Sequence, residues 1–354
     1  MEAVLEKKIE AKSVKATSSQ PELDSFIISC NDKIDSNDFE WINTTQLDDI
    51  KRISIMACGL ANKHRLNDIP RVNKFLEKAN RSLNRDDYLL VCLETKDSRK
   101  TRILNKHPRI LSLPYYILDF ILKRVFPKWK VTKKIYFWLT KGNNRVISLT
   151  EGLGRLVSCG FEIVNYKRIG YLTYILTKKK SDPVYDMEPT YGPIVRLKRI
   201  GKNEKLFTVY KLRTMHPYSE YLQEYVFTKN NLQEGGKFKD DFRVTVWGKL
   251  FRKLWIDELP MFINFFKGQM KLVGVRPLSS HYFSLYPRDV QRLRTKVKPG
   301  LIPPFYADLP QTLPEIIESE RVYLELYLKH PITTDVKYFF KAMNNIIVKR
   351  AHSN

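Results

Sequence analysis

The sequence of 354 residues has little cysteine and no long apolar run. Its four cysteines (Cys30, Cys58, Cys92 and Cys159) are scattered and form no C-x-x-C pair, which favours reduced, buried thiols and a cytosolic compartment. No run of about 18 apolar residues occurs, so we expect no membrane-spanning helix and, at most, attachment to a membrane from one side. The first 20 residues are charged and lack the apolar core of a signal peptide.

Acidic residues are also scarce, because 62 Lys and Arg face 38 Asp and Glu, for a formal net charge of +24. Such an excess favours a polyanionic partner, which could be nucleic acid, an anionic membrane surface or a phosphorylated substrate. General solubility of a basic protein is the alternative. The length predicts two domains, each large enough for its own core.

The first part of the chain alternates strand and helix patterns, which predicts an α/β domain at residues 23–182 after a flexible N-terminus at residues 1–22. Short apolar runs predict strands, and apolar residues at helical spacing predict helices. The expected strands are Phe26–Cys30, Tyr88–Leu93, Phe161–Asn165 and Tyr171–Thr177, and the expected helices are Ile69–Leu83 and Glu151–Cys159.

This region resembles the later half of a class I methyltransferase fold. The resemblance lies in NKFLEKANRSLNRDDYLLVCLET (residues 73–95), in LGRLVSCGFEIV (153–164) and in a closing strand that ends in lysines. The glycine-rich first turn that would cradle S-adenosylmethionine has no counterpart, so we expect a degenerate, Rossmann-like domain without methyltransferase activity.

Residues 101–141 form a basic insertion within this domain, with ten Lys or Arg and a single acid, Asp119. Aromatic and aliphatic residues of Leu111–Phe126 stand between cationic flanks. Such a segment can lie in the headgroup layer of an anionic membrane. The alternative is a pair of helices packed on the α/β domain with solvated lysines.

A proline-rich stretch at residues 183–193 predicts a linker, and residues 194–354 then form a second domain with a helical C-terminal tail. Its second strand, Leu206–Met215, places Lys211 and Arg213 on one face because side chains alternate along a strand. Two cations on an apolar strand favour a phosphate-binding position, and a solvated strand edge is the alternative.

The most informative stretch is Phe251–Pro277, where Asp257 and Glu258 stand at the start of an apolar helical pattern. We expect Asp257 to cap this helix, and Leu259, Phe262, Ile263 and Phe266 to form a stripe that faces the core. Arg252 precedes the acidic pair, and Arg276 lies in a turn after the next strand. Carboxylates beside a helix N-terminus and arginines suggest phosphoryl chemistry with a metal ion.

Residues 191–300 resemble the monotopic phosphoglycosyl transferase superfamily, that is, the bacterial sugar transferase family. The marks are RIGKN (199–203), VYKLRTM (209–215), D-x-R-V-T-x-W-G-K-x-x-R from Asp241, IDELP (256–260), NFFKGQMKLVGVRPL (264–278) and VKPG (297–300). Their order and spacing make the combination specific, whereas each motif alone is weak.

The resemblance implies transfer of a phospho-sugar from a UDP-sugar to polyprenyl phosphate at the cytoplasmic face of the bacterial inner membrane. It implies that Asp257 is the nucleophile that holds the phospho-sugar and expels UMP, and that Glu258 ligates Mg²⁺. It further implies that Lys211, Arg213, Arg252 and Arg276 hold phosphates or the nucleotide.

Three departures from the family accompany this resemblance, and one of them is that LIPPFYADLPQ (301–311) follows VKPG where the family has a threonine-glycine-tryptophan stretch and a further arginine. The family carries a re-entrant apolar helix shortly before its basic strand, where this chain has the end of the α/β domain and the linker. In the turn before Arg276, Val275 replaces a proline of the family.

We therefore expect an α/β (α+β) protein in which a degenerate Rossmann-like domain precedes a mixed α/β sugar transferase domain. The leading function is the enzyme described above, with an anionic membrane surface as a partner. A non-catalytic, membrane-associated protein that binds sugar nucleotides and regulates other enzymes is the alternative. No motif supports nucleic-acid binding, and homo-oligomer formation stays open.

Overall fold

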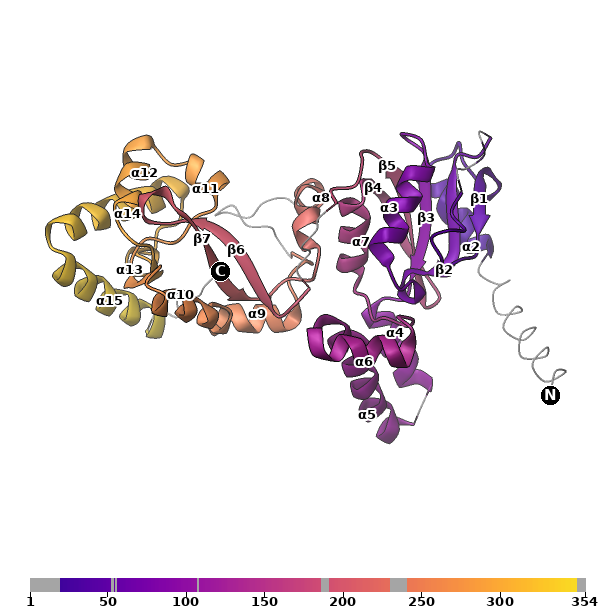
Figure 1. The fold of residues 1–354 in the computed structure, drawn as a ribbon, viewed down its shortest axis with the longest axis horizontal. Coiled ribbons are helices and arrows are strands. Elements are labelled where there is room, and N and C mark those ends of the chain that lie inside the picture. The colour runs from indigo at the N-terminus through magenta and orange to yellow at the C-terminus, as the bar shows by residue number, and fades with distance from the viewer. Residues whose placement is uncertain are drawn as a thin grey trace. The chain divides into compact units, whose positions relative to one another are not determined.

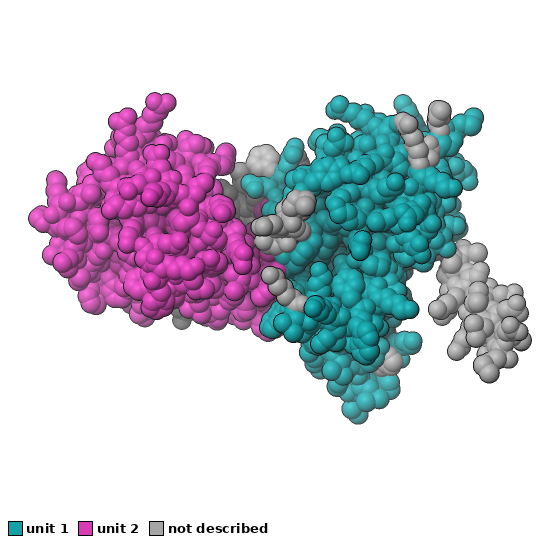
Figure 2. All heavy atoms as spheres, in the orientation of Figure 1, with its two compact units in different colours: residues 1–191, 217–225 teal, residues 192–216, 226–354 magenta. Residues whose placement is uncertain are grey.

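The computed structural model describes residues 20–51, 54, 56–106, 108–185, 191–229 and 241–348, and these fall into two compact units (Figure 2). Unit 1 comprises Met1–Tyr191 and Pro217–Tyr225, and unit 2 comprises Gly192–His216 and Val226–Asn354. The boundary after Tyr191 lies inside the expected linker, residues 183–193. Of the expected flexible N-terminus, residues 1–19 lie outside the described residues.

Unit 1 is built on a five-stranded sheet of order β1-β2-β3-β5-β4 (Figure 1). The first three strands are parallel neighbours, and β5 runs antiparallel to both β3 and β4. The strands are β1 (Phe39–Ile42), β2 (Gly59–Arg65), β3 (Tyr88–Leu93), β4 (Phe161–Ile169) and β5 (Leu172–Lys179). The helices are α2 (Gln20–Cys30), α3 (Val72–Ser82), α4 (Lys96–Lys106), α5 (Arg109–Phe120), α6 (Lys130–Thr140) and α7 (Leu149–Ser158). The expected α/β class is confirmed.

One strand expectation is wrong, because Phe26–Cys30 is the second half of helix α2. Leu23, Phe26 and Ile27 stand at helical spacing and are buried together against the sheet. A short apolar run cannot be assigned to strand or helix by periodicity alone, and packing on the sheet decides it here. Helices α3 and α7 lie together on the opposite side of the sheet (Figure 1).

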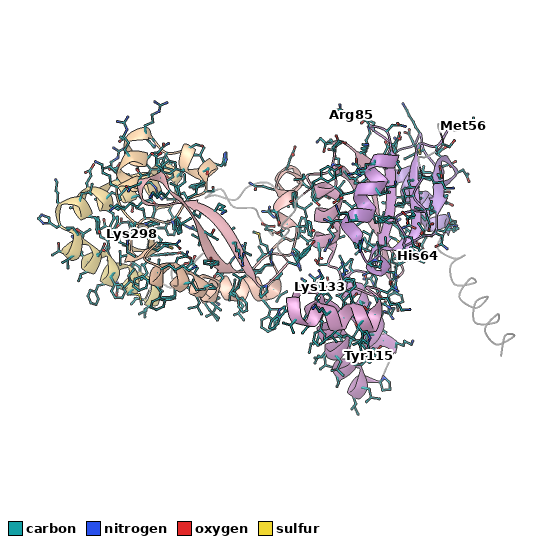
Figure 3. The ribbon with its side chains drawn as sticks, viewed as in Figure 1. Met56, His64, Arg85, Tyr115, Lys133 and Lys298 are labelled. Atoms are coloured by element: carbon teal, nitrogen blue, oxygen red, sulfur yellow. The ribbon has the colours of Figure 1, made fainter. Side chains whose placement is uncertain are left out.

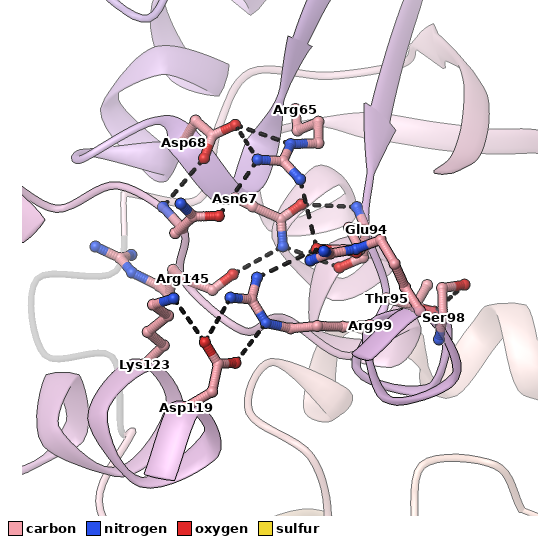
Figure 4. Close-up of polar contacts among 12 residues, drawn as sticks. Arg65, Asn67, Asp68, Glu94, Thr95, Ser98, Arg99, Asp119, Lys123 and Arg145 are labelled. Atoms are coloured by element: carbon pink, nitrogen blue, oxygen red, sulfur yellow. Dashed lines mark hydrogen bonds and ion pairs between the residues drawn. The ribbon is translucent and has the colours of Figure 1, made fainter. Parts of the chain in front are cut away.

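The basic insertion forms most of helices α4 to α6, and α4 and α5 are tied to the end of β3 by buried ion pairs (Figure 4). Glu94 follows β3 and accepts from Arg102 at 2.5 Å and from Arg99 at 3.2 Å. Arg99 on α4 also donates to Asp119 on α5 at 2.6 and 2.9 Å. Burial opposes ionisation of Asp119, but the bonds from Arg99 and Lys123 lower its pKa overall.

These helices pack on the α/β sheet and also keep large apolar side chains in solvent. Leu118 is 67% exposed, and Trp138 is 81% exposed. The expectation of packed helices for residues 101–141 is therefore met in the structure, whereas a surface for the headgroup layer stays a prediction.

Unit 2 contains two small sheets and a set of helices. An antiparallel ribbon joins β6 (Ile194–Ile200) to β7 (Leu206–Leu212), and β8 (Lys271–Val273) pairs in parallel with β9 (Gly300–Ile302). Two helices precede β8: α9 (Val246–Lys253) and α10 (Phe262–Phe266), which follows a 3-10 turn at Ile256–Met261. The later helices are α11 (Ser280–Ser284), α12 (Arg288–Thr295), α13 (Phe305–Asp308), α14 (Leu313–Lys329) and α15 (Pro331–Ile347). Helix α8 (Gln223–Lys229) spans the boundary at which the chain passes from unit 1 back to unit 2.

A buried amide fixes the acidic turn against the basic strand. Asn264 on α10 is fully buried, donates to the carbonyl oxygen of Thr208 at 2.6 Å and accepts from the backbone N–H of Tyr210 at 3.2 Å. Because Thr208 and Tyr210 lie on β7, these bonds hold the Ile256–Met261 turn beside Lys211. No helix of the described residues is both long and apolar enough to cross a membrane.

Candidate functional site

Unit 2 contains a pocket of about 400 Å³ that collects residues from the ribbon, the acidic turn, the turn after β8 and α14. Its charged wall brings three predicted site residues, Lys211, Glu258 and Arg276, together with Arg199 and Glu320. The remaining wall is apolar or aromatic, and it includes Leu197, Val209, Met261, Leu278, Tyr282, Tyr286, Phe305 and Tyr306. A cationic patch within an apolar wall suits a phosphorylated ligand that also has an organic part.

Lys211 and Glu258 form an ion pair across the pocket wall. The Nζ atom of Lys211 lies 2.6 Å from Oε1 of Glu258, and both side chains are less than one-fifth exposed. Lys211 lies near the end of β7, where Val195 is its partner in β6. The structure therefore brings the basic strand and the acidic pair into direct contact.

Asp257 is buried beside this pair, and its side chain is incompletely bonded. Its residue is 6% exposed, and its Oδ1 atom is shielded from solvent without a hydrogen-bond partner among the described residues. Burial raises the pKa of Asp257, Lys211 lowers it, Glu258 raises it and Arg252 lowers it, and the net shift is upward. A buried carboxylate with an unbonded oxygen costs stability, which is typical of a group held for chemistry.

The backbone before Asp257 is turned sharply. Trp255 has φ 61° and ψ 10°, a left-handed conformation that a bulky residue seldom adopts. Its ring packs on Tyr306, with 4.2 Å between the ring centroids. The expectation that Asp257 caps the helix is wrong, because Trp255 occupies the capping position and Asp257 lies inside the 3-10 turn.

Arg252 and Arg213 occupy different surroundings, and neither lines the described pocket. Arg252, on α9, donates from Nε to the Thr214 hydroxyl at 3.1 Å and attracts Asp257 electrostatically. Burial lowers the pKa of Arg252, and Asp257 and Asp241 oppose that shift. Arg213 lies beyond the end of β7, where its Nε donates to the carbonyl oxygen of Gly192 at 2.9 Å.

Arg276 reaches the pocket because two chain segments approach each other closely. A Cβ atom on Gly300 would lie 2.1 Å from the backbone nitrogen of Gly274. The last position of the VKPG motif must therefore be glycine for these two segments to approach so closely. The backbone N–H of Gly300 donates to the carbonyl oxygen of Val275 at 3.0 Å. Arg294, itself buried, donates to the carbonyl oxygen of Arg276.

The pocket also contains residues that the sequence reasoning did not select. Arg199 lines the wall, and burial together with the nearby charge of Arg276 lowers its pKa. It lies two residues after Leu197, another lining residue, so strand alternation in the basic run could have indicated it. Glu320, paired with Arg294, comes from α14, and no local signal connects it with the site.

Several motif residues support the site without lining it. Asp241 pairs with Arg243 at 2.7 Å, and the Thr245 hydroxyl accepts from the backbone N–H of Gly248 at 2.8 Å to cap α9. A Cβ atom on Gly248 would lie 2.0 Å from the carbonyl oxygen of Thr214, so α9 can approach Thr214 only with glycine there. These residues fix the position of α9, the helix that carries Arg252.

The described residues contain no cluster of three or more His, Cys, Asp or Glu side chains that could hold a metal ion alone. Magnesium typically takes one or two protein carboxylates and completes its shell with phosphate oxygens and water. The Glu258 carboxylate in the pocket and the unbonded Oδ1 of Asp257 fit that pattern. The donors present therefore fit Mg²⁺ bound together with a phosphorylated substrate.

The apolar stripe after the acidic pair does not face the core, contrary to expectation. Leu259 is 55% exposed, Phe266 is 82% exposed, and Phe262 and Ile263 are each more than 40% exposed. The polar side of α10 is the buried one, because Asn264 anchors it to β7. Helical spacing correctly grouped these apolar residues on one face of the helix. The bond of Asn264 to β7 turns the opposite face inward, so the apolar face points to solvent.

Residues 185–349 match the family model described as bacterial sugar transferase, which confirms the resemblance drawn from the motifs. The galactosyl transferase CpsE of Streptococcus agalactiae is 31% identical over 160 residues, which are 44% of this chain and 35% of that protein. The undecaprenyl-phosphate galactose phosphotransferase of Salmonella typhimurium is 29% identical over 238 residues, 62% of this chain and 47% of that protein.

The uncharacterized sugar transferase EpsL of Bacillus subtilis is 42% identical over 103 residues, 29% of this chain and 45% of that protein. The chain thus spans between about a third and a half of the length of these three relatives. A solved SAM-dependent methyltransferase of Thermotoga maritima shares 17% identity at a TM-score of 0.23, covers 37% of this chain and 59% of its own, and supports no conclusion about unit 1.

Proposed function

We propose that unit 2, as a bacterial sugar transferase domain, moves a phospho-sugar from a UDP-sugar to polyprenyl phosphate and releases UMP. The observation that carries this proposal is the buried Asp257 carboxylate, with one oxygen unbonded, next to the Lys211–Glu258 pair and a cationic pocket. One of the relatives named above is the undecaprenyl-phosphate galactose phosphotransferase of Salmonella typhimurium.

The reaction takes two displacements at one phosphorus atom. A carboxylate oxygen of Asp257 attacks the β-phosphorus of the UDP-sugar, and the bond from that phosphorus to the oxygen shared with the α-phosphorus breaks, so that UMP leaves with the electron pair. A phosphate oxygen of polyprenyl phosphate then attacks the same phosphorus. The Asp257 carboxylate leaves, and a polyprenyl diphosphate sugar forms.

The pocket residues divide the remaining work. Arg276 and Arg199 line the wall where the diphosphate would lie, and arginine can bind phosphate oxygens in pairs. Lys211 supplies a point charge next to Glu258, and Arg252 favours the ionised, nucleophilic form of Asp257. Mg²⁺ held by Glu258 would offset the charge of the diphosphate and reduce its repulsion of a carboxylate.

The acceptor is a membrane lipid, and unit 2 has an apolar surface that suits a membrane boundary. Trp247 (69% exposed), Leu254 (55%), Leu259 (55%) and Phe266 (82%) lie within the segment from α9, through the acidic turn, to α10. Lys249, Lys253 and Lys267 come from the same segments. Apolar residues beside lysines favour binding to an anionic leaflet, and we place the site at the cytoplasmic face of the inner membrane.

The enzyme proposal is tested by measuring UMP release from a panel of UDP-sugars with polyprenyl phosphate, membranes and Mg²⁺. At least one donor should release UMP, and Asp257→Asn should slow the release by about a thousandfold or more, as expected for loss of a nucleophile. Asp289→Asn, at an exposed position of α12, is the matched control. Tight binding of a UDP-sugar without turnover of any donor would instead favour a regulatory protein.

Sedimentation with anionic vesicles tests the membrane surface separately. Phe266→Glu should reduce the bound fraction, while Tyr171→Glu, an equivalent change at an exposed aromatic residue of unit 1, should leave it unchanged. Equal binding of both variants and the wild type would contradict this membrane surface.

A further inference from the structure

Unit 1 contains a second cavity, of about 570 Å³, that the sugar transferase reaction does not use. Its lining comes entirely from unit 1 and is strongly cationic, with seven Arg and Lys against two Glu. The cations are Arg71, Lys74, Arg124, Lys128, Lys133, Arg145 and Arg155. Its volume lies within the range of small-molecule sites, about 300–1,000 Å³.

The cavity lies where parallel α/β sheets commonly bind ligands. Helix α3 follows β2 through the short turn Leu66–Asp68, so its N-terminus stands beyond the carboxyl end of that strand. The first residues of the helix, Val72, Asn73 and Lys74, line the cavity. The helix has no side-chain cap at its N-terminus, and uncapped N–H groups there attract anions.

Two arginines of the wall have buried nitrogen atoms without acceptors. The Nε atoms of Arg145 and Arg155 are shielded from solvent and have no hydrogen-bond partner among the described residues. Arg145 donates from Nη2 to the carbonyl oxygen of Pro70 at 3.0 Å, but no carboxylate of the described residues forms an ion pair with it. Burial and the nearby charge of Arg155 both lower the pKa of Arg145.

The two carboxylates of the wall are already engaged. Glu151 pairs with Arg124 and, at 2.8 Å, with Arg155, and Glu77 pairs with Lys74 at 2.8 Å. Arg145 therefore has no directly paired carboxylate within the cavity, and Glu151, already held by two arginines, attracts it only from a distance. Since a buried charge without a counterion is costly, a bound anion would stabilise this arrangement.

The uncharged part of the wall indicates what else the ligand carries. The aromatic rings of Phe137 and Tyr191 and the apolar side chains of Val72 and Val146 line the same cavity. Lys133 lies 5.9 Å from the centroid of the Phe137 ring, as does the Arg145 guanidinium, so this ring borders the cationic region. A flat or apolar group could pack there while its phosphate contacts the cations.

We propose that unit 1 binds a small phosphorylated ligand, with one or two phosphates on an organic body of nucleotide size, in this cavity. Two sources share this chemistry. One is a free nucleotide. The other is a phospholipid headgroup, because α6, which supplies Lys133 and Phe137, also exposes Val131 and Trp138 to solvent.

The test is calorimetric titration of the full chain with ADP and, separately, with a short-chain phosphatidylglycerol below its micellar concentration. ADP avoids the uridine nucleotides proposed for unit 2. Lys133→Gln and Arg145→Gln should each weaken binding about tenfold or more, as expected for a lost charged contact to phosphate. Lys133 is exposed, so its replacement keeps the test valid if Arg145→Gln fails to fold.

Arg85→Gln is the matched control, because Arg85 is an exposed residue of unit 1 far from Lys133 (Figure 3). It should bind like the wild type. Binding of ADP alone would identify a nucleotide site, and binding of the lipid alone a headgroup site. Full affinity in both cavity variants, or no binding of either probe at millimolar concentration, would overturn the proposal.

Discussion

Each unit has a carboxylate buried near cations, Glu151 in unit 1 and Asp257 in unit 2, and the two differ in their bonding and in the direction of their pKa shift. Glu151 in unit 1 is 2% exposed and is paired with Arg124 and Arg155. Burial opposes its ionisation, but the two arginines hold its pKa far below the usual range. Asp257 in unit 2 is 6% exposed, keeps one oxygen unbonded, and has a raised pKa.

The difference separates a carboxylate that stabilises the fold from one available for reaction. The bond from Arg124 joins α7 to the segment after α5, and the bond from Arg155 lies within α7, so the charge of Glu151 is fully paired in stabilising the fold. The cations nearest Asp257 are committed elsewhere, since Lys211 pairs with Glu258 and Arg252 bonds to Thr214. An under-bonded carboxylate can accept a new bond to phosphorus without first breaking an ion pair.

The largest effect should appear in stability, and it should separate the two carboxylates. Glu151→Gln leaves Arg124 and Arg155 without a counter-charge and should lower the free energy of unfolding by about 3–5 kcal/mol. Asp257→Asn should leave it unchanged or raise it, because a poorly bonded charge is removed. Chemical denaturation of both variants measures the free energy of unfolding. An equal loss in the two variants would contradict the distinction between a structural and a reactive carboxylate.

Removal of the metal should affect the two regions differently. Glu258→Gln should raise the Mg²⁺ concentration needed for half-maximal UMP release by about tenfold or more, because one ligand becomes a weaker neutral donor. Glu325→Gln, at an exposed position of α14, should not. The thermal stability of unit 1 should not depend on Mg²⁺. An unchanged Mg²⁺ requirement in Glu258→Gln would remove Glu258 from the metal site.

The pH dependence should be the smallest effect, and it follows from pKa shifts of opposite direction, upward for Asp257 and downward for Glu151. Ionised Asp257 is the reactive form and its pKa is raised, so UMP release should increase with pH through a midpoint above about 3.9, the ordinary value for Asp. Because Arg252 lowers that pKa, Arg252→Gln should move the midpoint upward, while exposed Arg292→Gln should not. A midpoint that stays in place in Arg252→Gln would refute the coupling.

For Glu151 the pKa is lowered, so its stabilising contribution is present above the unfolded-state pKa of about 4.3 and is lost as the pH falls through the lower, folded-state value. Acid unfolding followed in wild type and Glu151→Gln measures it. The acid-dependent part of the stability should be smaller in the variant.

The sequence predicted which elements meet at the site but not how they face. The motif order joined Lys211 to the acidic pair, and the structure places Lys211 2.6 Å from Glu258. Helical spacing also found the face of Leu259 and Phe266. Its direction depended on Asn264, whose partners lie more than 50 residues away on β7, so local periodicity could not supply it.

Long-range contacts explain the other omissions. Glu320 reaches the pocket from α14 through its pairing with Arg294, a contact 26 residues apart that leaves no local pattern. The cavity of unit 1 gathers residues between Pro70 and Tyr191, and each of its seven cations is an ordinary Lys or Arg in the sequence. Positions whose role depends on distant partners are those that pattern reasoning misses.

The most direct test is the mass of the intact protein after incubation with a UDP-sugar and Mg²⁺ in the absence of polyprenyl phosphate. We expect an increase equal to one phospho-sugar, located by peptide mapping on Asp257, absent in Asp257→Asn and lost when polyprenyl phosphate is added. Release of UMP without any adduct, or an adduct on another residue, would contradict the assignment of Asp257 as the nucleophile.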